Sequence, residues 1–192
     1  MEGALDQSRV LELGESVCLR FPVERDRAGF IALRSGSRAH LEPWEPLPPR
    51  GFDPFGDDAF DREMECRQLR EQERWLITRL GDGVIVGRLT VTAIERGPFQ
   101  NGRFGYWIGA GFTGRGYMTE ALRLGVRRSF TTLGLHRVEA NIQPHNLASR
   151  RAVEKAGFRL EGYSPRYLEI GGEWADHERW AVTREMWEAA AP

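Results

Sequence analysis

The chain has 192 residues, of which 41% are hydrophobic and 29% charged, and its formal net charge is −1. This length suits one domain with a substantial core, so we expect a single domain over residues 1–192, with residues 1–13 as an N-terminal extension. Basic and acidic residues are interspersed, and no apolar run is long enough to cross a bilayer. We therefore expect no direct nucleic-acid binding, no membrane segment and a cytoplasmic location.

The first half of the chain predicts strands, helices and one long loop. Val17, Leu19 and Phe21 alternate as in a strand, and Gly81-Asp82-Gly83 is a strong hairpin turn signal. The expected segments, in chain order, are a strand over 15–21, a helix after Pro22, an irregular loop with five prolines over 41–56, a helical pattern over 57–73 and paired strands over 74–80 and 84–94. We interpret the proline-rich loop as a mobile flap over a binding site.

The second half predicts one parallel crossover and a closing hairpin. A strand over 103–108, a helix over about 115–134 and a strand over 136–142 follow one another, which favours parallel pairing of the two strands. Asn146 is a good N-cap for the next helix, and Gly157 suits its left-handed end. Strands over 163–170 and 174–183 then pair across Gly171-Gly172.

The segment 105–118, GYWIGAGFTGRGYM, is the most informative part of the chain. A short aromatic strand runs into a turn that contains Gly109, Gly111, Gly114 and Gly116, and an amphipathic helix follows. Glycines allow close approach of the backbone to a ligand, and the first turn of the helix offers free N–H groups at its positive end. The segment therefore predicts a phosphate-binding loop.

Residues 109–114 also match the G-x-G-x-x-G pattern of dinucleotide-binding proteins. That pattern requires an acidic residue about 20 positions further on, where this chain has Gly134. A nicotinamide enzyme is therefore the weaker interpretation.

Taken together, the strand, the glycine-rich turn and helix, and the later N-x-x-S…GF pattern resemble the GNAT superfamily of acetyl-CoA-dependent N-acetyltransferases. The segments 105–122 (GYWIGAGFTGRGYMTEAL), 136–163 and 167–182 are similar to that family, as is HLEPWEP in the proline-rich loop. The segment 167–182 and HLEPWEP are most similar to the ribosomal-protein alanine N-acetyltransferase (RimJ/RimL-like) branch of the family. The resemblance implies an α/β fold with a mixed, mostly antiparallel sheet, splayed at one parallel pair and flanked by about four helices.

The resemblance also implies which residues bind acetyl-CoA. Backbone groups from Trp107 to Gly109, including Ile108, would lie along the pantetheine arm, and Asn141 or Asn146 would bind that arm. The pyrophosphate would be held by the N–H groups of Gly111, Phe112, Thr113, Gly114, Arg115, Gly116 and Tyr117, with the charge of Arg115 added.

Catalysis by direct attack of an amine requires a neutral nucleophile and a proton source for the departing thiolate. The tyrosine that many family members carry four residues before the GF pair is Val153 here, so we expect Ser149 to serve instead. The glutamate that related enzymes carry two residues before GYW is Arg103, which leaves Glu95 as the expected base. His145 and His177 are alternative bases. Each of these two histidines fits equally well a structural role in which it is hydrogen-bonded.

Cys18 and Cys66 lack the context of a nucleophile or a metal ligand, so we expect no acyl-enzyme and no metal. Trp44 and Tyr106 are expected to contact the acceptor.

The expected acceptor is the α-amine of a protein, possibly a ribosomal protein, because an amine with a pKa near 7.7–8.0 is roughly 10–20% neutral at pH 7. Two alternatives stay open. One is a small amine, which a deep acidic cleft beneath the flap would favour. The other is a coenzyme-sensing or ribosome-docking module without turnover. A monomer and a homodimer fit the sequence equally.

Overall fold

The computed structural model describes residues 9–65 and 71–190, and Cys66 lies outside these ranges. Eight strands form one sheet: β1 (Val10–Leu13), β2 (Val17–Arg20), β3 (Glu73–Arg79), β4 (Ile85–Glu95), β5 (Asn101–Ile108), β6 (Arg137–Ile142), β7 (Arg159–Ile170) and β8 (Glu173–Thr183). The α-helices are α1 (Arg27–Gly36), α2 (Arg38–Leu41), α3 (Asp57–Glu65), α4 (Tyr117–Thr131), α5 (Leu147–Lys155) and α6 (Arg184–Ala189). Short 3₁₀ turns are η2 (Glu24–Asp26), η3 (Glu42–Trp44) and η5 (Ala110–Phe112).

Two sequence expectations are corrected. Residues 10–13, expected in an extension, form the edge strand β1, which pairs antiparallel with β2. Six α-helices are present among the described residues instead of about four, because α2 and α6, of four and six residues, are too short to carry a clear periodic signal.

The sheet is mixed and contains one parallel pair among the described strands. The strand order is β1-β2-β3-β4-β5-β6-β8-β7, and β5 and β6 are parallel as predicted. Their pairing runs from Asn101↔Arg137 to Phe104↔Ala140 and then stops, although β5 continues to Ile108. The two strands therefore diverge beyond Phe104, which confirms the splayed sheet.

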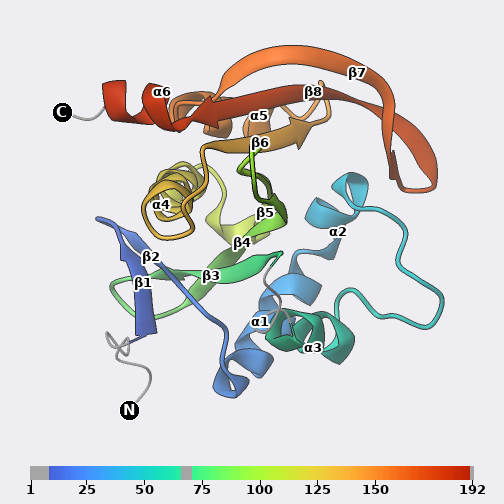
Figure 1. Ribbon diagram of the computed structural model, residues 1–192. Coiled ribbons are helices and arrows are strands. Elements are labelled where there is room, and N and C mark those ends of the chain that lie inside the picture. The colour runs from blue at the N-terminus through green and yellow to red at the C-terminus, as the bar shows by residue number, and fades with distance from the viewer. Residues whose placement is uncertain (1–8, 66–70, 191–192) are drawn as a thin grey trace.

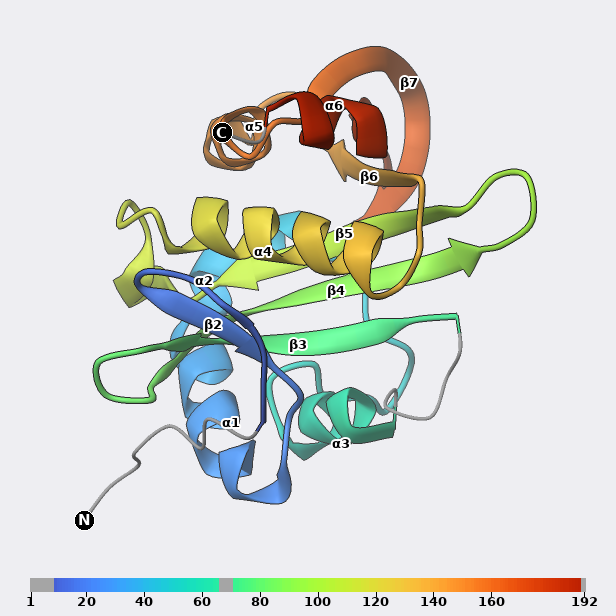
Figure 2. The same cartoon turned by 60° about the vertical axis from the view of Figure 1, so that its left-hand side comes forward.

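Helices cover both faces of the sheet (Figures 1 and 2). Helix α4 crosses the face formed by β1, β2, β4 and β6, and α5 packs beside it. Helices α1 and α3 pack together on the opposite face. Each face has its own buried cluster, one centred on residues such as Leu89 and Phe130 and the other on Phe30, Phe60 and Trp107.

Helix α4 lies very close to the sheet because of Gly125. A Cβ at that position would come within 2.5 Å of Leu89 Cδ2, so any larger residue would push the helix outward. The close packing fixes the start of α4 relative to the end of β5, and this is where the site is found.

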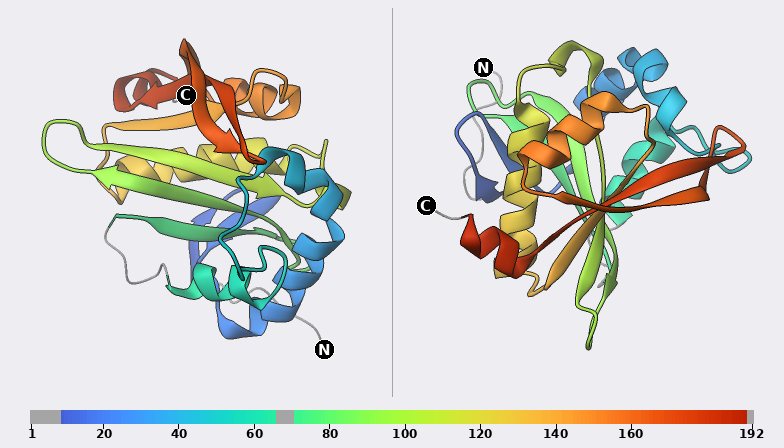
Figure 3. Two further views of the ribbon diagram at one scale, coloured as in Figure 1. Left: turned by 90° about the vertical axis from the view of Figure 1, so that its right-hand side faces the viewer. Right: turned by 90° about the horizontal axis from the view of Figure 1, so that it is seen from above.

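The flap over 41–56 is held at both ends. Arg34 of α1 donates two hydrogen bonds from Nη2 to the Glu45 carboxylate, each 2.8 Å, and one from Nε to the Pro54 carbonyl. The turn between β7 and β8 also contributes, because Gly171 N donates to Glu45 O at 3.0 Å. The long β7–β8 hairpin extends from the body of the molecule toward the flap (Figure 3).

Candidate active site

Two cavities meet near the end of β5. The glycine-loop cavity, about 410 Å³, is lined by the turn before α4, the start of α4 and one side of α5. The flap cavity, about 520 Å³, lies beneath the proline-rich segment. Six residues line both: Trp44, Glu45, Tyr106, Trp107, Asn146 and Ser149. A ligand in one cavity can therefore meet a ligand in the other at these side chains.

Glycines shape the glycine-loop cavity in two different ways. Gly114 and Gly116 have φ of +72° and +81°, a region that L-residues rarely adopt, and a Cβ on either would meet no atom of the described residues within 4 Å. They thus allow the turn and leave the space beside it open. Gly109 is required by packing instead, because a Cβ there would collide with Leu33.

The N-terminus of α4 is suited to an anion. Its N-cap is Gly116, which offers no side chain to the first N–H groups of this 15-residue helix. The acid in the first turn, Glu120, faces elsewhere, since its Oε1 accepts hydrogen bonds from the backbone N of Glu15 and Ser16 at 2.5 and 2.9 Å. Basic side chains that line the cavity are His40, Arg115, Arg151 and Lys155. The residues present therefore fit a pyrophosphate and a further phosphate.

The divergence of β5 and β6 exposes backbone groups to the same cavity. Gly109 N donates to Val86 O of the strand on one side. In an antiparallel ladder, alternate residues direct their N–H and C=O groups to opposite edges, so Tyr106 and Ile108 direct theirs toward the gap. An extended amide-containing arm can bond there as an additional strand would.

Tyr106 and Ser149 are joined by a hydrogen bond at the junction of the two cavities. The Tyr106 Oη to Ser149 Oγ distance is 2.5 Å. Ser149 is fixed by the cap of α5, because Asn146 Oδ1 accepts from Ser149 N at 3.1 Å, as the predicted N-cap requires. Burial raises the pKa of Tyr106 above its ordinary value, so its hydroxyl keeps its proton through neutral pH.

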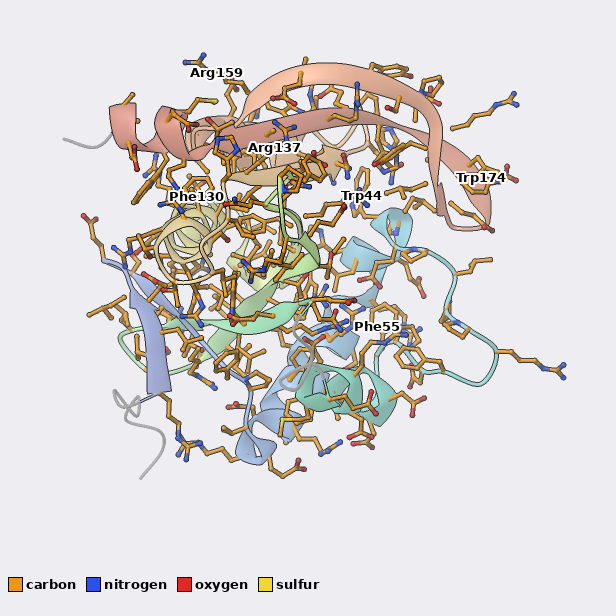
Figure 4. All side chains as sticks on the ribbon, viewed as in Figure 1. Trp44, Phe55, Phe130, Arg137, Arg159 and Trp174 are labelled. Carbon is orange, nitrogen blue, oxygen red and sulfur yellow. The ribbon has the colours of Figure 1, made fainter. Side chains whose placement is uncertain are left out.

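Trp44, labelled in Figure 4, is the last residue of η3 in the flap and lines both cavities. Its ring lies 5.1 Å from that of His145, centroid to centroid. His145 lines neither cavity among the residues described, whereas His177, buried at 3% exposure, lines the flap cavity. His177 Nδ1 lies 2.9 Å from the Ala175 carbonyl oxygen, which only accepts, so Nδ1 carries the proton and Nε2 is the basic nitrogen.

Two sequence-predicted residues lie elsewhere than expected. Glu95 is exposed, pairs with Asn101 at the start of β5 and lines neither cavity within the described part of the chain. Asn141 lines only the flap cavity, where its buried Oδ1 has no hydrogen-bond partner among residues 9–65 and 71–190, whereas Asn146 lines both cavities.

Other side chains at the site were not anticipated from the sequence. Arg151 and Lys155 are four residues apart on α5, which places both on one side of the helix. This spacing is the sequence pattern from which the two basic residues could have been predicted to lie together. The flap cavity also has charged residues from several elements: Arg34, Glu45, Arg62, Glu63, Arg74, Arg88 and Arg103. This lining is not the acidic cleft that would favour a small polyamine.

No helix within residues 9–65 and 71–190 is both long enough and apolar enough to cross a membrane.

The splayed sheet, the glycine turn and the paired cavities define an acetyltransferase of the GNAT type. The family model described as Acetyltransferase (GNAT) domain matches residues 16–159, and the chain belongs to this family.

Its relatives place it in the RimJ/RimL-like group of N-acetyltransferases. It is 39% identical over 179 residues to the Probable N-acetyltransferase YjcK of Bacillus subtilis (strain 168), covering 88% of this chain and 94% of that protein. It is 32% identical over 177 residues to the [Ribosomal protein uS5]-alanine N-acetyltransferase of Escherichia coli (strain K12), covering 90% of each. Mycobacterium smegmatis RimJ, solved in complex with CoA-disulfide, superposes with a TM-score of 0.81 at 36% identity, covering 88% of this chain and 82% of that one.

Proposed function

We propose that this enzyme uses acetyl-CoA to acetylate the N-terminal α-amine of a protein such as a ribosomal protein. The chain over 1–192 would act in the cytoplasm as one acetyltransferase domain. The acceptor class is supported by the relatives named for ribosomal-protein alanine acetylation and by a flap cavity that is not acidic. The observation that carries the mechanism is the hydrogen-bonded Tyr106–Ser149 pair where the two cavities meet.

The glycine-loop cavity would hold the coenzyme. The turn and the N-terminus of α4 bind its pyrophosphate, and Arg115, Arg151 and Lys155 add positive charge. Asn146 and the strand edge at Tyr106 and Ile108 bind the amide arm. When bound, acetyl-CoA supplies an acetyl thioester, which is the activated acyl donor.

The flap cavity would hold the acceptor amine, with Trp44 and Tyr106 beside it. The amine nitrogen forms a bond to the acetyl carbon while the carbon–sulfur bond breaks, and the sulfur keeps the electron pair. Ser149 donates its hydroxyl proton toward the sulfur, and Tyr106 donates to Ser149 in turn, so the pair acts as one donor.

The nitrogen must also lose a proton. We propose His177 Nε2, directly or through water, as the acceptor of that proton in place of Glu95, because His177 lines the flap cavity and Glu95 does not. An α-amine needs only modest help from a base, since about 10–20% of it is already neutral at pH 7.

The test is release of coenzyme thiol from acetyl-CoA with three acceptor sets: peptides with a free N-terminus, N-blocked lysine peptides and small amines. Mass spectrometry locates the acetyl group on each product. Turnover on α-amines alone is expected. Turnover on lysine or small amines alone would reject the proposed acceptor, and saturable acetyl-CoA binding without turnover on any amine would indicate a non-catalytic module.

A further inference from the structure

The flap cavity is strongly basic for a site that receives a positively charged amine. Its described lining includes five arginines and two glutamates, an excess of three positive charges. The arginines come from α1, α3, β3, β4 and β5: Arg34, Arg62, Arg74, Arg88 and Arg103. Such convergence from five separate elements needs an explanation beyond a solvated surface.

Glu63 accounts for only part of this charge. It is 4% exposed, and its Oε1 lies 3.2 Å from Arg74 Nη1 and 3.1 Å from Arg88 Nη1. One carboxylate is thus shared by two guanidinium groups, so within the described part of the chain one positive charge in this largely buried place lacks a carboxylate of its own.

Of the remaining three arginines, two are neutralised by glutamates and one adds positive charge. Arg34 is paired with Glu45 through both carboxylate oxygens. Arg62 is exposed, and its guanidinium lies 4.6 Å from the centre of the Phe52 ring. Arg103 lies 3.6 Å from Glu139, which also accepts from Arg137 Nε at 3.0 Å, but Arg137 is paired with Glu161 as well, so this group of two arginines and two glutamates is neutral.

Several donors in this cluster lack an acceptor. Arg34 Nη1, Arg74 Nε and Arg88 Nε are buried and have no hydrogen-bond partner among the described residues. Guanidinium N–H groups that are removed from water without an acceptor are unfavourable, and carboxylates and phosphates match their planar geometry. The unpaired guanidinium donors and the excess positive charge therefore both favour binding of an anionic group in the flap cavity.

We propose that the acceptor carries an acidic group close to its reactive amine, and that the arginines of the flap cavity bind this group. For a peptide acceptor, the acidic side chain would belong to the second or third residue, because an extended chain advances about 3.3–3.6 Å per residue. This inference rests on the proposed function. It also predicts discrimination against polyamines and lysine-rich N-termini, which the same charges repel.

The test uses synthetic peptides that begin with alanine and differ only at residues two and three. One set has aspartate, one asparagine, one lysine, and one phosphoserine to distinguish carboxylate from phosphate recognition. Thiol release gives kcat/KM for each. We expect the aspartate or phosphoserine peptide to exceed the asparagine peptide by about tenfold or more and the lysine peptide by a larger factor, with smaller ratios at high salt.

Two variants identify the source of the preference. Arg62→Gln, in an exposed position that lines the flap cavity, should lower the ratio of aspartate to asparagine kcat/KM severalfold, mainly through KM. Arg25→Gln removes the same charge from an exposed position that lines neither cavity within the described residues, and it should leave the ratio unchanged.

The outcomes separate the two proposals. Turnover with equal rates on aspartate and asparagine peptides, or a preference for lysine, would overturn the inference and leave the proposed function standing. An unchanged ratio in Arg62→Gln together with a changed ratio in Arg25→Gln would show long-range charge instead of binding in the cavity, and would also overturn it. No turnover on any α-amine would overturn both.

Discussion

Tyr106→Phe is the substitution that most directly isolates the donor pair. It removes one hydroxyl and keeps the ring that lines both cavities. The lost interaction is the single 2.5 Å hydrogen bond to Ser149 Oγ. Because the pair is proposed to act as one donor toward the sulfur, we expect the loss typical of one preorganised donor, which lowers kcat by about 10²–10³, or about 2.7–4 kcal/mol. The loss of one buried hydrogen bond should lower the free energy of unfolding by only about 1 kcal/mol.

The assay is kcat from thiol release, with the dissociation constant of acetyl-CoA measured by calorimetry. We expect affinity to change by less than about threefold, because the charged half of the coenzyme would bind at the distant glycine turn. The matched control is Tyr163→Phe, which removes a hydroxyl that donates to Asp176 on the β7–β8 hairpin, and it should leave kcat unchanged. A kcat for Tyr106→Phe within about threefold of the wild type would refute the reasoning.

A double-mutant cycle extends the same test. If Tyr106 and Ser149 act as one donor, Ser149→Ala and the double variant should each lose about as much kcat as Tyr106→Phe alone. If the fold loss of kcat in the double variant instead equals the product of the losses in the two single variants, the two hydroxyl groups act independently.

Further predictions concern the coenzyme, pH and stability. Gly114→Glu adds strain at φ +72° and a negative charge beside the proposed phosphate site, so calorimetry should detect no acetyl-CoA binding, whereas Gly97→Glu, at φ +71° in open space outside both cavities, should bind normally. The kcat/KM should rise with the fraction of neutral α-amine and level off above about pH 9. The kcat/KM should not decline before about pH 10, because the raised pKa of Tyr106 keeps its hydroxyl protonated, and a decline near pH 8 would contradict this. The contribution of the neutral Tyr106 hydroxyl to the free energy of unfolding is likewise lost only as pH rises through the raised pKa. Asp26→Ala leaves buried Arg20 unpaired and should cost about 3–5 kcal/mol in urea unfolding, against under about 1 kcal/mol for exposed Asp57→Ala; similar costs for the two would contradict the burial argument.

Local signals made much of the fold predictable. The cap at Asn146, the left-handed stop at Gly157 with φ of +94° and the turn at Gly171-Gly172 each depend on a few adjacent residues, and all three are present. The parallel crossover through α4 was also predictable, because the segment between the two strands is long enough for a helix. Strand β1 was not, since a four-residue edge strand depends on its partner β2.

The site was predictable only where it is contiguous in sequence. The glycine turn and Ser149 belong to such segments, but the pairing of Ser149 with Tyr106, 43 residues away, depends on the packed fold. The arginines of the flap cavity come from five elements, so no spacing in the sequence reveals them.

Glu95 lies away from the two cavities for a topological reason. Strands β4 and β5 are antiparallel, so the end of β4 lies beside the start of β5 at Asn101. The two cavities meet at the other end of β5, five residues or about 17 Å further along from Asn101 to Tyr106. The direction of each strand relative to the glycine turn places Glu95 away from the cavities and places residues of β8 such as His177 beside them.

A bisubstrate conjugate provides the most direct test that the two cavities form one active site. The sulfur of CoA would be joined through –CH₂–CO– to the α-amine of an alanine-starting peptide with aspartate at residues two and three, and the dissociation constant of the conjugate would be compared with those of CoA and the peptide alone. If both parts bind at once across Tyr106 and Ser149, the conjugate should bind at least 10²-fold more tightly than either part, and Gly114→Glu and Arg62→Gln should each weaken it. A conjugate that binds no more tightly than CoA itself would contradict the shared site.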